Sequence, residues 1–594
     1  MTSAECKDDQ PRVLKQARRR VPLQFDENGD PYFESVTSPE SFPVRALCQL
    51  PPPHVIPVIF VPGIMGTLLC GNKKSGGKDQ KAWYPPNGIG ESLGEVLRRL
   101  FQSAAERQKQ MGPDVVQVDN SGPVKIPKGL YTLTEKEAKR RGWGEVHLGS
   151  YGEILAELEL SLNDQYLDAE NISDDPKPMS VWQVAQTFER VTKKEKIDVR
   201  KEWNPAGATI EPLTHDEFMR LDDYYYPVWA CGYNWLASNG DSADRLIDRI
   251  NEILAYYSKG QYWKPTGKVI IVTHSMGGFV GRRAAQKLAG MGDGTTEKAG
   301  AGTILGVVHG VQPVGGAPIV YRRFRAGTEV HGVDPMSAGL AVVVGWSAAS
   351  ITCVMANSPG PLELLPTKHY EPRWLRFKRA TYGKQVPAML PLPIDDPYAE
   401  IYSKTTDDAW WGMIDPKLIN PAGLNRKKGE TDDDALAADL ARYKKNIETA
   451  SNFHEALGLC CHDVTYAYYG ADKNQVSYGS VTWSTKDDVG AEFESVLSGM
   501  TTKNYNRQGK VTLAHNGQNA VFRLEEGKPG DLESAGDGTV PAGSGQLIAV
   551  SKESPIVFRM DGFDHQYSYN NANVRNCVMY CIGKIVQLAP TIGE

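Results

Sequence analysis

One stretch of this chain, Lys268 to Gln286, leaves few folds open to it. It begins with Val269-Ile270-Ile271-Val272, a continuous β-branched run that is typical of a strand buried on both faces of a parallel sheet. The run stops at the turn THSMGG, and apolar residues then recur at helical spacing. A strand, a tight turn and a helix predict that Ser275 stands on a strained turn, which lifts its hydroxyl away from the sheet.

The composition of this turn mostly agrees with that prediction. Two glycines follow Met276 and supply the small residues that the turn needs, whereas Thr273 stands where glycine is usual. The alternative is that Ser275 only caps a helix. Beyond the turn, Arg282 and Arg283 are expected on the exposed side of the helix.

An earlier apolar run has the features of a partner strand. Residues 55–61 read as a buried strand and lead directly into the turn PGIMGT, which has two glycines at its corners. We expect the backbone amide of Ile64 or Met65 to form one side of an oxyanion hole, with the amide of Met276 as the other side. The alternative is an ordinary turn. A donor of this kind contributes about 2.7–4 kcal/mol to transition-state stabilisation.

The C-terminal part of the chain supplies a carboxylate and a histidine in the expected order. Asp537 lies between two glycines in AGDGTVP, and residues 555–560 read as a last strand, followed by His565. Serine, acid, then histidine is the chain order of an α/β-hydrolase triad. We therefore predict that Ser275 attacks an ester carbonyl, that His565 takes and returns the proton, and that Asp537 orients the imidazole.

Other residues compete for these roles. His274 points away from its neighbour's hydroxyl on such a turn, His309 lies before the acid, and His462 reads as a packed core histidine. Asp564 is adjacent to the histidine base, but adjacent side chains on an extended loop diverge. The serine motif at residues 240–242 opens an amphipathic helix and does not follow a strand.

The alternation of strands and helices predicts an α/β fold, namely an α/β-hydrolase fold in which a mainly parallel sheet is covered by helices on both faces. A chain of 594 residues is too long for one plain core, so large inserted cap and lid regions are expected. The predicted parts are an N-terminal arm (1–53), a first core part (54–330) with an insertion at about 71–212, a lid and cap insertion (331–530), and a second core part (531–594) with the acid and base.

Two segments allow more than one interpretation. Residues 335–362 contain no charged side chain, which favours a lid helix over the site; a core helix or a membrane-inserting segment is the alternative. Trp83-Tyr84-Pro85 follows the predicted oxyanion turn, and either lines the substrate cleft or packs in the core.

Composition and the N-terminal sequence indicate which classes of partner and which cellular compartment to expect. A net charge of −6 argues against a nucleic-acid partner. Nine scattered cysteines indicate reduced thiols, and Cys577 and Cys581 have no further ligands nearby in sequence, which argues against a zinc site. No cofactor and no catalytic metal are expected, and no cluster of ligands requires a structural calcium, which the sequence leaves open. The N-terminus carries charge where a signal peptide would be apolar, so we expect synthesis in the cytoplasm and export by another route.

Together, six short blocks resemble the lecithin:cholesterol acyltransferase-like lipases and are similar to the glycosylphosphatidylinositol inositol-deacylase-like hydrolases. Where those acyltransferases tend to have Asp-Trp-Arg, this chain has Asn234-Trp235-Leu236, so the resemblance does not settle the exact lipid specificity. The blocks are VPGIMG (61–66), GYNW (232–235), THSMGG (273–278), GGAP (315–318), LLP (364–366) and GDGTVP (536–541).

The resemblance implies an acyl-ester hydrolase or acyltransferase that acts on membrane lipids without a metal. A large chain with inserted caps and no signal peptide also resembles the antibacterial lipase effectors of the type VI secretion system. That resemblance implies delivery by a secretion apparatus, attack on membrane phospholipids from a rival cell's periplasm, and an immunity protein as partner. The alternative is that the protein is not an enzyme but a binding module that perturbs membranes through residues 335–362.

Overall fold

The structure is a computed structural model of the 594-residue chain. It describes residues 17–35, 37, 39–40, 44–74, 80–87, 102–165, 179–192, 195–290, 302–328, 347–379, 388–487, 499–515 and 517–592.

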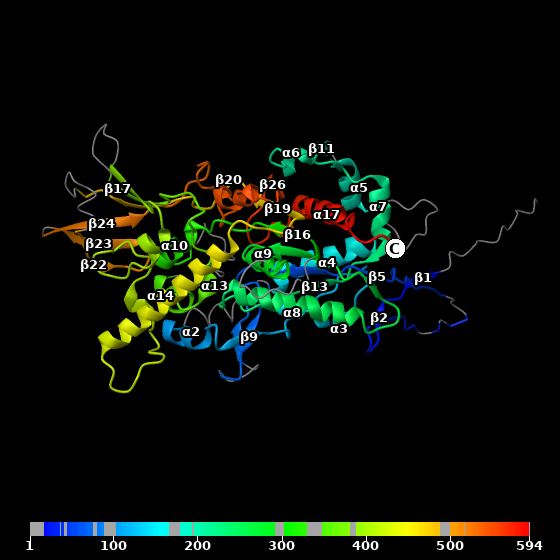
Figure 1. Cartoon of the computed structure of the whole chain (residues 1–594), viewed down its shortest axis with the longest axis horizontal. Helices are drawn as coiled ribbons and strands as arrows, with labels where there is room; N and C mark the ends of the chain where they lie inside the picture. Colours follow the sequence, from blue (N-terminus) through cyan, green and yellow to red (C-terminus); the bar gives the residue numbers. More distant parts are fainter. Residues whose placement is uncertain are drawn as a thin grey trace, which may run out of the picture.

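Six parallel strands form a sheet through the centre of the molecule (Figure 1). Their order is β13-β6-β15-β16-β19-β26. The first of these strands in sequence, β6, therefore lies inside the sheet, with β13 on one side and the other four strands on the other side. Parallel strands share one carboxyl edge, which is where ligand sites of open α/β sheets lie. The strands are β6 (Val58–Val61), β13 (Val228–Ala230), β15 (Val269–His274), β16 (Ile304–Gly310), β19 (Thr465–Gly470) and β26 (Ile556–Met560).

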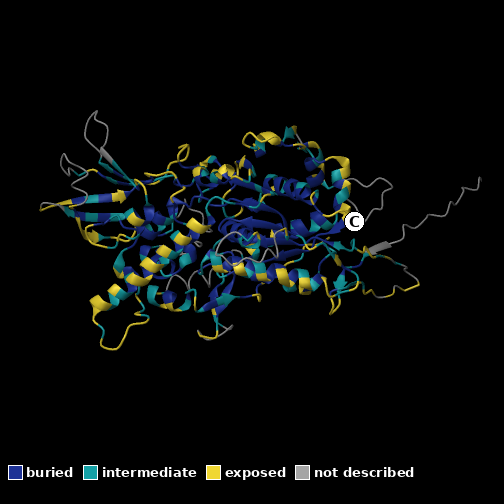
Figure 2. Cartoon of the chain, viewed as in Figure 1, coloured by how far each residue is buried: buried dark blue, intermediate teal, exposed yellow. Residues whose placement is uncertain are grey.

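Helices cover both faces of this sheet, and its strands are the dark, buried centre of Figure 2. Alternate residues of β6 belong to two different hydrophobic clusters, Ile59 and Val61 to one and Val58 and Phe60 to the other. This explains why the strand is apolar throughout. The first cluster includes α8 (Asn239–Tyr257), α9 (Gly277–Leu288) and α14 (Asp432–Leu457); the second includes α4 (Leu148–Asn163), α5 (Ser180–Thr187) and α17 (Ala572–Val586).

The expectation that Arg282 and Arg283 are exposed is wrong. Their exposed fractions are 2% and 5%. Arg282 donates hydrogen bonds of 2.7 Å to the carbonyl oxygens of Gly458 and Cys460, just past the end of α14. The cap region therefore covers this side of α9, where cationic side chains meet the exposed carbonyls of a helix C-terminus.

A second six-stranded sheet lies at the far left end of the molecule in Figure 1, with the order β18-β17-β21-β24-β23-β22. All of its strands fall within the range 331–530, where a cap was expected. Two strands of that range depart from the expectation. Strand β19 pairs with β16 and β26 in the central sheet, and β20 (Asp472–Val476) pairs with β25 (Ala535–Gly536) of the second core part. The strands of the second sheet are β17 (Leu375–Arg379), β18 (Ala388–Leu392), β21 (Val481–Thr485), β22 (Thr501–Tyr505), β23 (Lys510–His515) and β24 (Gln518–Leu524).

The expected lid, residues 335–362, is described only in its second part, since residues 335–346 lie outside the described ranges. The described part contains α12 (Ala348–Met355) and α13 (Pro359–Leu362). Both are mostly buried, and the Gly360 amide donates to the Leu236 carbonyl at 3.3 Å. Among the described helices, none has the length and apolar character to cross a bilayer.

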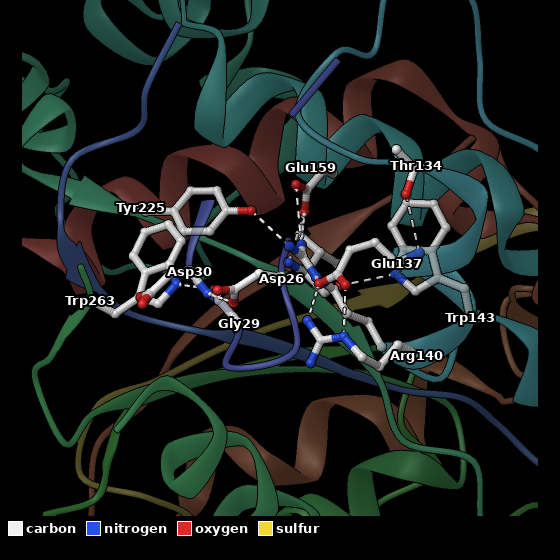
Figure 3. A network of polar contacts seen from close by, with 12 residues as sticks. Asp26, Gly29, Asp30, Thr134, Glu137, Arg140, Trp143, Glu159, Tyr225 and Trp263 are labelled. Atoms are coloured by element: carbon white, nitrogen blue, oxygen red, sulfur yellow. Dashed lines mark hydrogen bonds and ion pairs between the residues drawn. The ribbon is translucent and has the colours of Figure 1, made fainter. Parts of the chain in front are cut away.

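The insertion expected at about 71–212 is fixed to the core by a buried ion network (Figure 3). The Arg141 side chain is fully buried and donates to Glu137 at 2.6 Å, to Glu159 at 3.2 Å and to the Tyr225 hydroxyl at 2.8 Å. Glu159 also accepts from the Val228 amide of β13 at 2.9 Å. Burial raises the pKa of Glu159, and the Arg141 charge opposes that rise. Removal of one partner from such a network costs about 3–5 kcal/mol, so helix α4 is held firmly on the sheet.

The described part of the N-terminal arm lies against the same region. The Asp30 carboxylate accepts from the amides of Gln261 and Tyr262, both at 2.9 Å, and Trp263 donates to the Gly29 carbonyl at 2.6 Å (Figure 3). The remaining short strands include β1 (Ala17–Arg20), β4 (Val44–Leu47), β5 (His54–Val55), β7 (Leu69–Gly71), β8 (Lys81–Trp83), β9 (Val116–Val118), β12 (Tyr224–Tyr225), β14 (Lys264–Pro265) and β25 (Ala535–Gly536).

Candidate active site

The candidate nucleophile occupies the sharp turn between β15 and α9. Ser275 has φ 52°, a left-handed conformation that a non-glycine residue rarely adopts, and it is 4% exposed. Its amide donates to the Gly310 carbonyl at 2.8 Å. Just beyond it, a Cβ on Gly277 would lie 2.4 Å from the Pro62 carbonyl oxygen. The surrounding backbone therefore holds the strained residue in place, as the predicted turn requires.

The structure brings the three predicted side chains together although they are far apart in sequence. His565 Nε2 lies 2.8 Å from Ser275 Oγ, and His565 Nδ1 lies 2.8 Å from Asp537 Oδ2. The Asp537 side chain is 1% exposed, and its other oxygen accepts from the amides of Thr539 at 3.0 Å and Val540 at 2.7 Å. An ionised carboxylate only accepts, so Nδ1 carries the proton and Nε2 is free to accept from the serine hydroxyl.

Two further contacts fix the loop that carries the histidine. The His565 amide donates to the Asp537 carbonyl at 2.7 Å, and the His565 carbonyl lies 2.8 Å from His274 Nε2. The imidazole is thus oriented by its own backbone as well as by the Asp537 carboxylate. Such preorganisation removes the need to order the residue during a reaction.

The predicted oxyanion turn lies directly against the nucleophile. A Cβ on Gly63 would be 2.9 Å from Ser275 Cβ, so the two turns are in close contact. Met276 is fully buried at the start of α9, and Met65 has φ 62°. Among the described residues, none accepts a hydrogen bond from the amide of Ile64, Met65 or Met276. These amides are therefore available as donors beside the Ser275 hydroxyl.

Three aromatic side chains donate hydrogen bonds to the backbone carbonyls of this turn. Tyr233 donates to the Pro62 carbonyl at 2.9 Å, Trp83 to the Met65 carbonyl at 2.7 Å, and Trp235 to a carbonyl in the same turn at 3.3 Å. Trp83 is 2% exposed and contacts Trp235 edge to face, so of the two interpretations of Trp83 the packed one holds. In these contacts the GYNW block holds the backbone of the turn and does not contact the nucleophile.

The competing residues are engaged elsewhere. Asp564 accepts from the Tyr567 amide at 3.0 Å, and His462 Nδ1 is bonded within its own loop to the backbone of Val464. His309 Nδ1 lies 2.8 Å from the Thr273 hydroxyl inside the sheet. Burial lowers the pKa of His309 to about 3, so it stays neutral.

Sequence reasoning missed one residue of this site, Tyr151. Its hydroxyl comes from helix α4 of the insertion and lies 3.1 Å from the Gly63 amide nitrogen and 3.0 Å from His274 Nδ1. A tyrosine inside an amphipathic helix has the pattern of a core residue, and no local signal distinguishes it. Only the contact between the insertion and the sheet edge reveals it.

The central parallel sheet, its two helical layers and the turns at its carboxyl edge define an α/β-hydrolase fold with large insertions. No protein-family model and no curated protein matches the chain. Among solved structures, the chain is similar to a chain in the crystal structure of the Tle4–Tli4 complex, with 28% sequence identity over 90% of this chain and 99% of that chain, and a TM-score of 0.69. A Staphylococcus hyicus lipase aligns at 14% identity over 65% of this chain and 92% of that chain, but its TM-score of 0.25 is too low to support an argument.

Proposed function

We propose that the protein is a serine lipase that hydrolyses acyl esters of membrane phospholipids, and that it acts as an antibacterial effector. The observation that carries the hydrolytic part is the hydrogen-bonded series Ser275–His565–Asp537 beside unengaged backbone amides. The six sequence blocks also support the hydrolytic part, and similarity to a chain of the Tle4–Tli4 complex supports the effector part.

In the proposed reaction, His565 Nε2 accepts the hydroxyl proton as Ser275 Oγ attacks the ester carbonyl carbon. The amide of Met276 and that of Ile64 or Met65 stabilise the negative oxygen of the tetrahedral intermediate. The ester C–O bond then breaks, the leaving alcohol takes the proton from His565, and the acyl group remains on the serine. Water repeats the sequence through the same imidazole and releases a fatty acid.

The proposed effector would have a partner protein and would act in the periplasm of a target cell. The similar chain was crystallised as a complex, which supports an immunity protein as partner of this chain. Action at a target-cell membrane from the periplasm, after delivery by a secretion apparatus, rests on the resemblance to type VI secretion effectors. Within the described part of the lid range, Gly360 of α13 packs next to residues 236–237 of the core.

The test measures fatty-acid release from phosphatidylethanolamine–phosphatidylglycerol liposomes by mass spectrometry. The wild type should release fatty acid, and Ser275→Ala should release none above the lipid-only background. Ser242→Ala is the matched control, since Ser242 is also buried but its hydroxyl bonds the Ser238 carbonyl at 3.1 Å in helix α8. Equal release by Ser275→Ala and the wild type would contradict the serine mechanism.

The same assay in ¹⁸O-labelled water distinguishes the acceptors of the acyl group. Hydrolysis of an acyl-enzyme places the label in the fatty-acid carboxylate, because water supplies the new oxygen. Acyl transfer to an added alcohol gives an unlabelled ester instead. Dominant ester formation at low alcohol concentration would replace hydrolysis with transfer as the proposed activity.

A further inference from the structure

His274 lies next to the nucleophile in sequence, is 1% exposed, and has a partner on each ring nitrogen. Its Nε2 lies 2.8 Å from the His565 carbonyl oxygen, and its Nδ1 lies 3.0 Å from the Tyr151 hydroxyl. The same hydroxyl lies 3.1 Å from the Gly63 amide nitrogen. A continuous series of hydrogen bonds therefore connects the predicted oxyanion turn to the loop that carries His565.

The direction of each bond in this series is fixed by its ends. A carbonyl oxygen can only accept, so the proton of neutral His274 is on Nε2 and is donated to His565. Nδ1 must then accept, so the Tyr151 hydroxyl donates to it and uses a lone pair to accept from the Gly63 amide. Burial and the nearby His565 ring lower the pKa of His274 to about 3, which keeps the ring neutral at neutral pH, and the His565 carbonyl then selects the tautomer.

The first turns of helix α4 make further contacts with both sides of the site. The His147 amide donates to the Gly66 carbonyl at 2.9 Å, on the oxyanion side. On the other side, Gln566 donates to the Ser150 hydroxyl at 2.7 Å, one residue beyond the base. Helix α4, which belongs to the insertion, thus bridges the two loops that a reaction would need to keep aligned.

We propose that His274 and Tyr151 are positioning residues, which hold the Gly63 turn and the His565 loop at a fixed separation so that the oxyanion donors and the base act as one unit. This inference rests on the proposed function. It also gives the insertion a part in the reaction, because the Tyr151 hydroxyl comes from α4. Neither side chain hydrogen-bonds the Ser275 hydroxyl in the structure, so each acts through the residues that it holds.

A purely structural role would use these contacts differently. Core packing needs ring volume and apolar contact, which a phenylalanine at position 151 would supply equally well. A positioning role needs the hydroxyl itself, because it satisfies both the Gly63 amide and His274 Nδ1. Loss of a single oxygen atom therefore separates the two roles.

The experiment compares Tyr151→Phe with Tyr226→Phe. Tyr226 is a matched control, since it is also fully buried and its hydroxyl makes one hydrogen bond of 3.0 Å, to the Leu221 carbonyl away from the site. For Tyr151→Phe we expect kcat for ester hydrolysis to fall up to about 100-fold with KM unchanged, because small displacements of reacting groups cost this much. Tyr226→Phe should keep the wild-type kcat.

Hydrogen–deuterium exchange of the uncomplexed full chain provides a readout that needs no activity. In Tyr151→Phe, amide exchange should rise in the peptides that cover residues 62–67 and 561–567, and in Tyr226→Phe it should not. His274→Asn keeps an acceptor near the Nδ1 position but cannot reach the His565 carbonyl, so exchange should rise mainly in 561–567.

The outcomes separate this inference from the proposed function. Equal exchange and equal kcat in the two tyrosine variants would overturn the positioning role while leaving the lipase in place. A wild type that releases no fatty acid would overturn the proposed function, and the exchange pattern would still decide whether the two loops are coupled through Tyr151.

Discussion

Gly277 offers a direct test of how closely the nucleophile turn and the oxyanion turn must approach. A Cβ on this residue would lie 2.4 Å from the Pro62 carbonyl oxygen and 2.6 Å from that of Val61. Both contacts are with backbone at the end of β6, a strand held between β13 and β15. The strand cannot move aside, so in Gly277→Ala the helix α9 must shift away from the oxyanion turn.

The size of the effect follows from two opposing contributions. Overpacking costs about 1–3 kcal/mol, whereas alanine gains about 1 kcal/mol over glycine inside a helix. We expect a net fall of up to about 2 kcal/mol in the free energy of unfolding. The catalytic effect should be larger, because a displacement of about 1 Å between Met276 and the turn can lower kcat about 100-fold.

Chemical denaturation and ester hydrolysis measure the two effects separately. Gly543→Ala serves as control, since Gly543 lies in the short helix α16 (Ala542–Gly545) with nothing within 4 Å of an added Cβ. This variant should be as stable as the wild type or slightly more so, and fully active. If Gly277→Ala had the stability and kcat of Gly543→Ala, the close approach of the two turns would not matter and the reasoning would be refuted.

Two further predictions follow from the site and the buried histidines. In Asp537→Asn the amide cannot hold the His565 tautomer that accepts from serine, so kcat should fall about 10⁴-fold with little change in KM; steady-state kinetics on a soluble ester measures both, and a loss below tenfold would contradict the role of the acid. Burial lowers the pKa of His274 and His309 to about 3 and of His454 to about 4. Because the unfolded chain binds these protons below about pH 6.5 and the folded chain does not, each histidine should lower the free energy of unfolding by about 2 kcal/mol at pH 5 relative to pH 8. Denaturation curves at the two pH values test this, and His454→Gln should weaken the dependence; an unchanged dependence would show that His454 is not held neutral.

Local patterns in the sequence carry most of the information about the sheet and the turns. The strand β15, its turn and helix α9 can be read from residues 268–286, because backbone conformation there depends on neighbours a few positions away. The left-handed Ser275 follows from the same local pattern. The chain order of Ser275, Asp537 and His565 was likewise readable, and the structure places their side chains in a hydrogen-bonded series.

Other features depend on which segments meet in space. The burial of Arg282 arises only because α14, far along the chain, ends beside α9. The addition of β19 to the central sheet is of the same kind, since a short strand does not show which sheet it will join.

The hydrogen bonds that link Gly63 through Tyr151 to His274 also depend on which segments meet in space. Apolar periodicity and glycine-rich turns determined the strands and the turn that carries Ser275, because these preferences act between near neighbours. The order of the reactive side chains is a property of the sequence itself. Only the folded chain decided that an inserted helix delivers a hydroxyl between the two halves of the site, because that contact depends on how the insertion packs on the sheet.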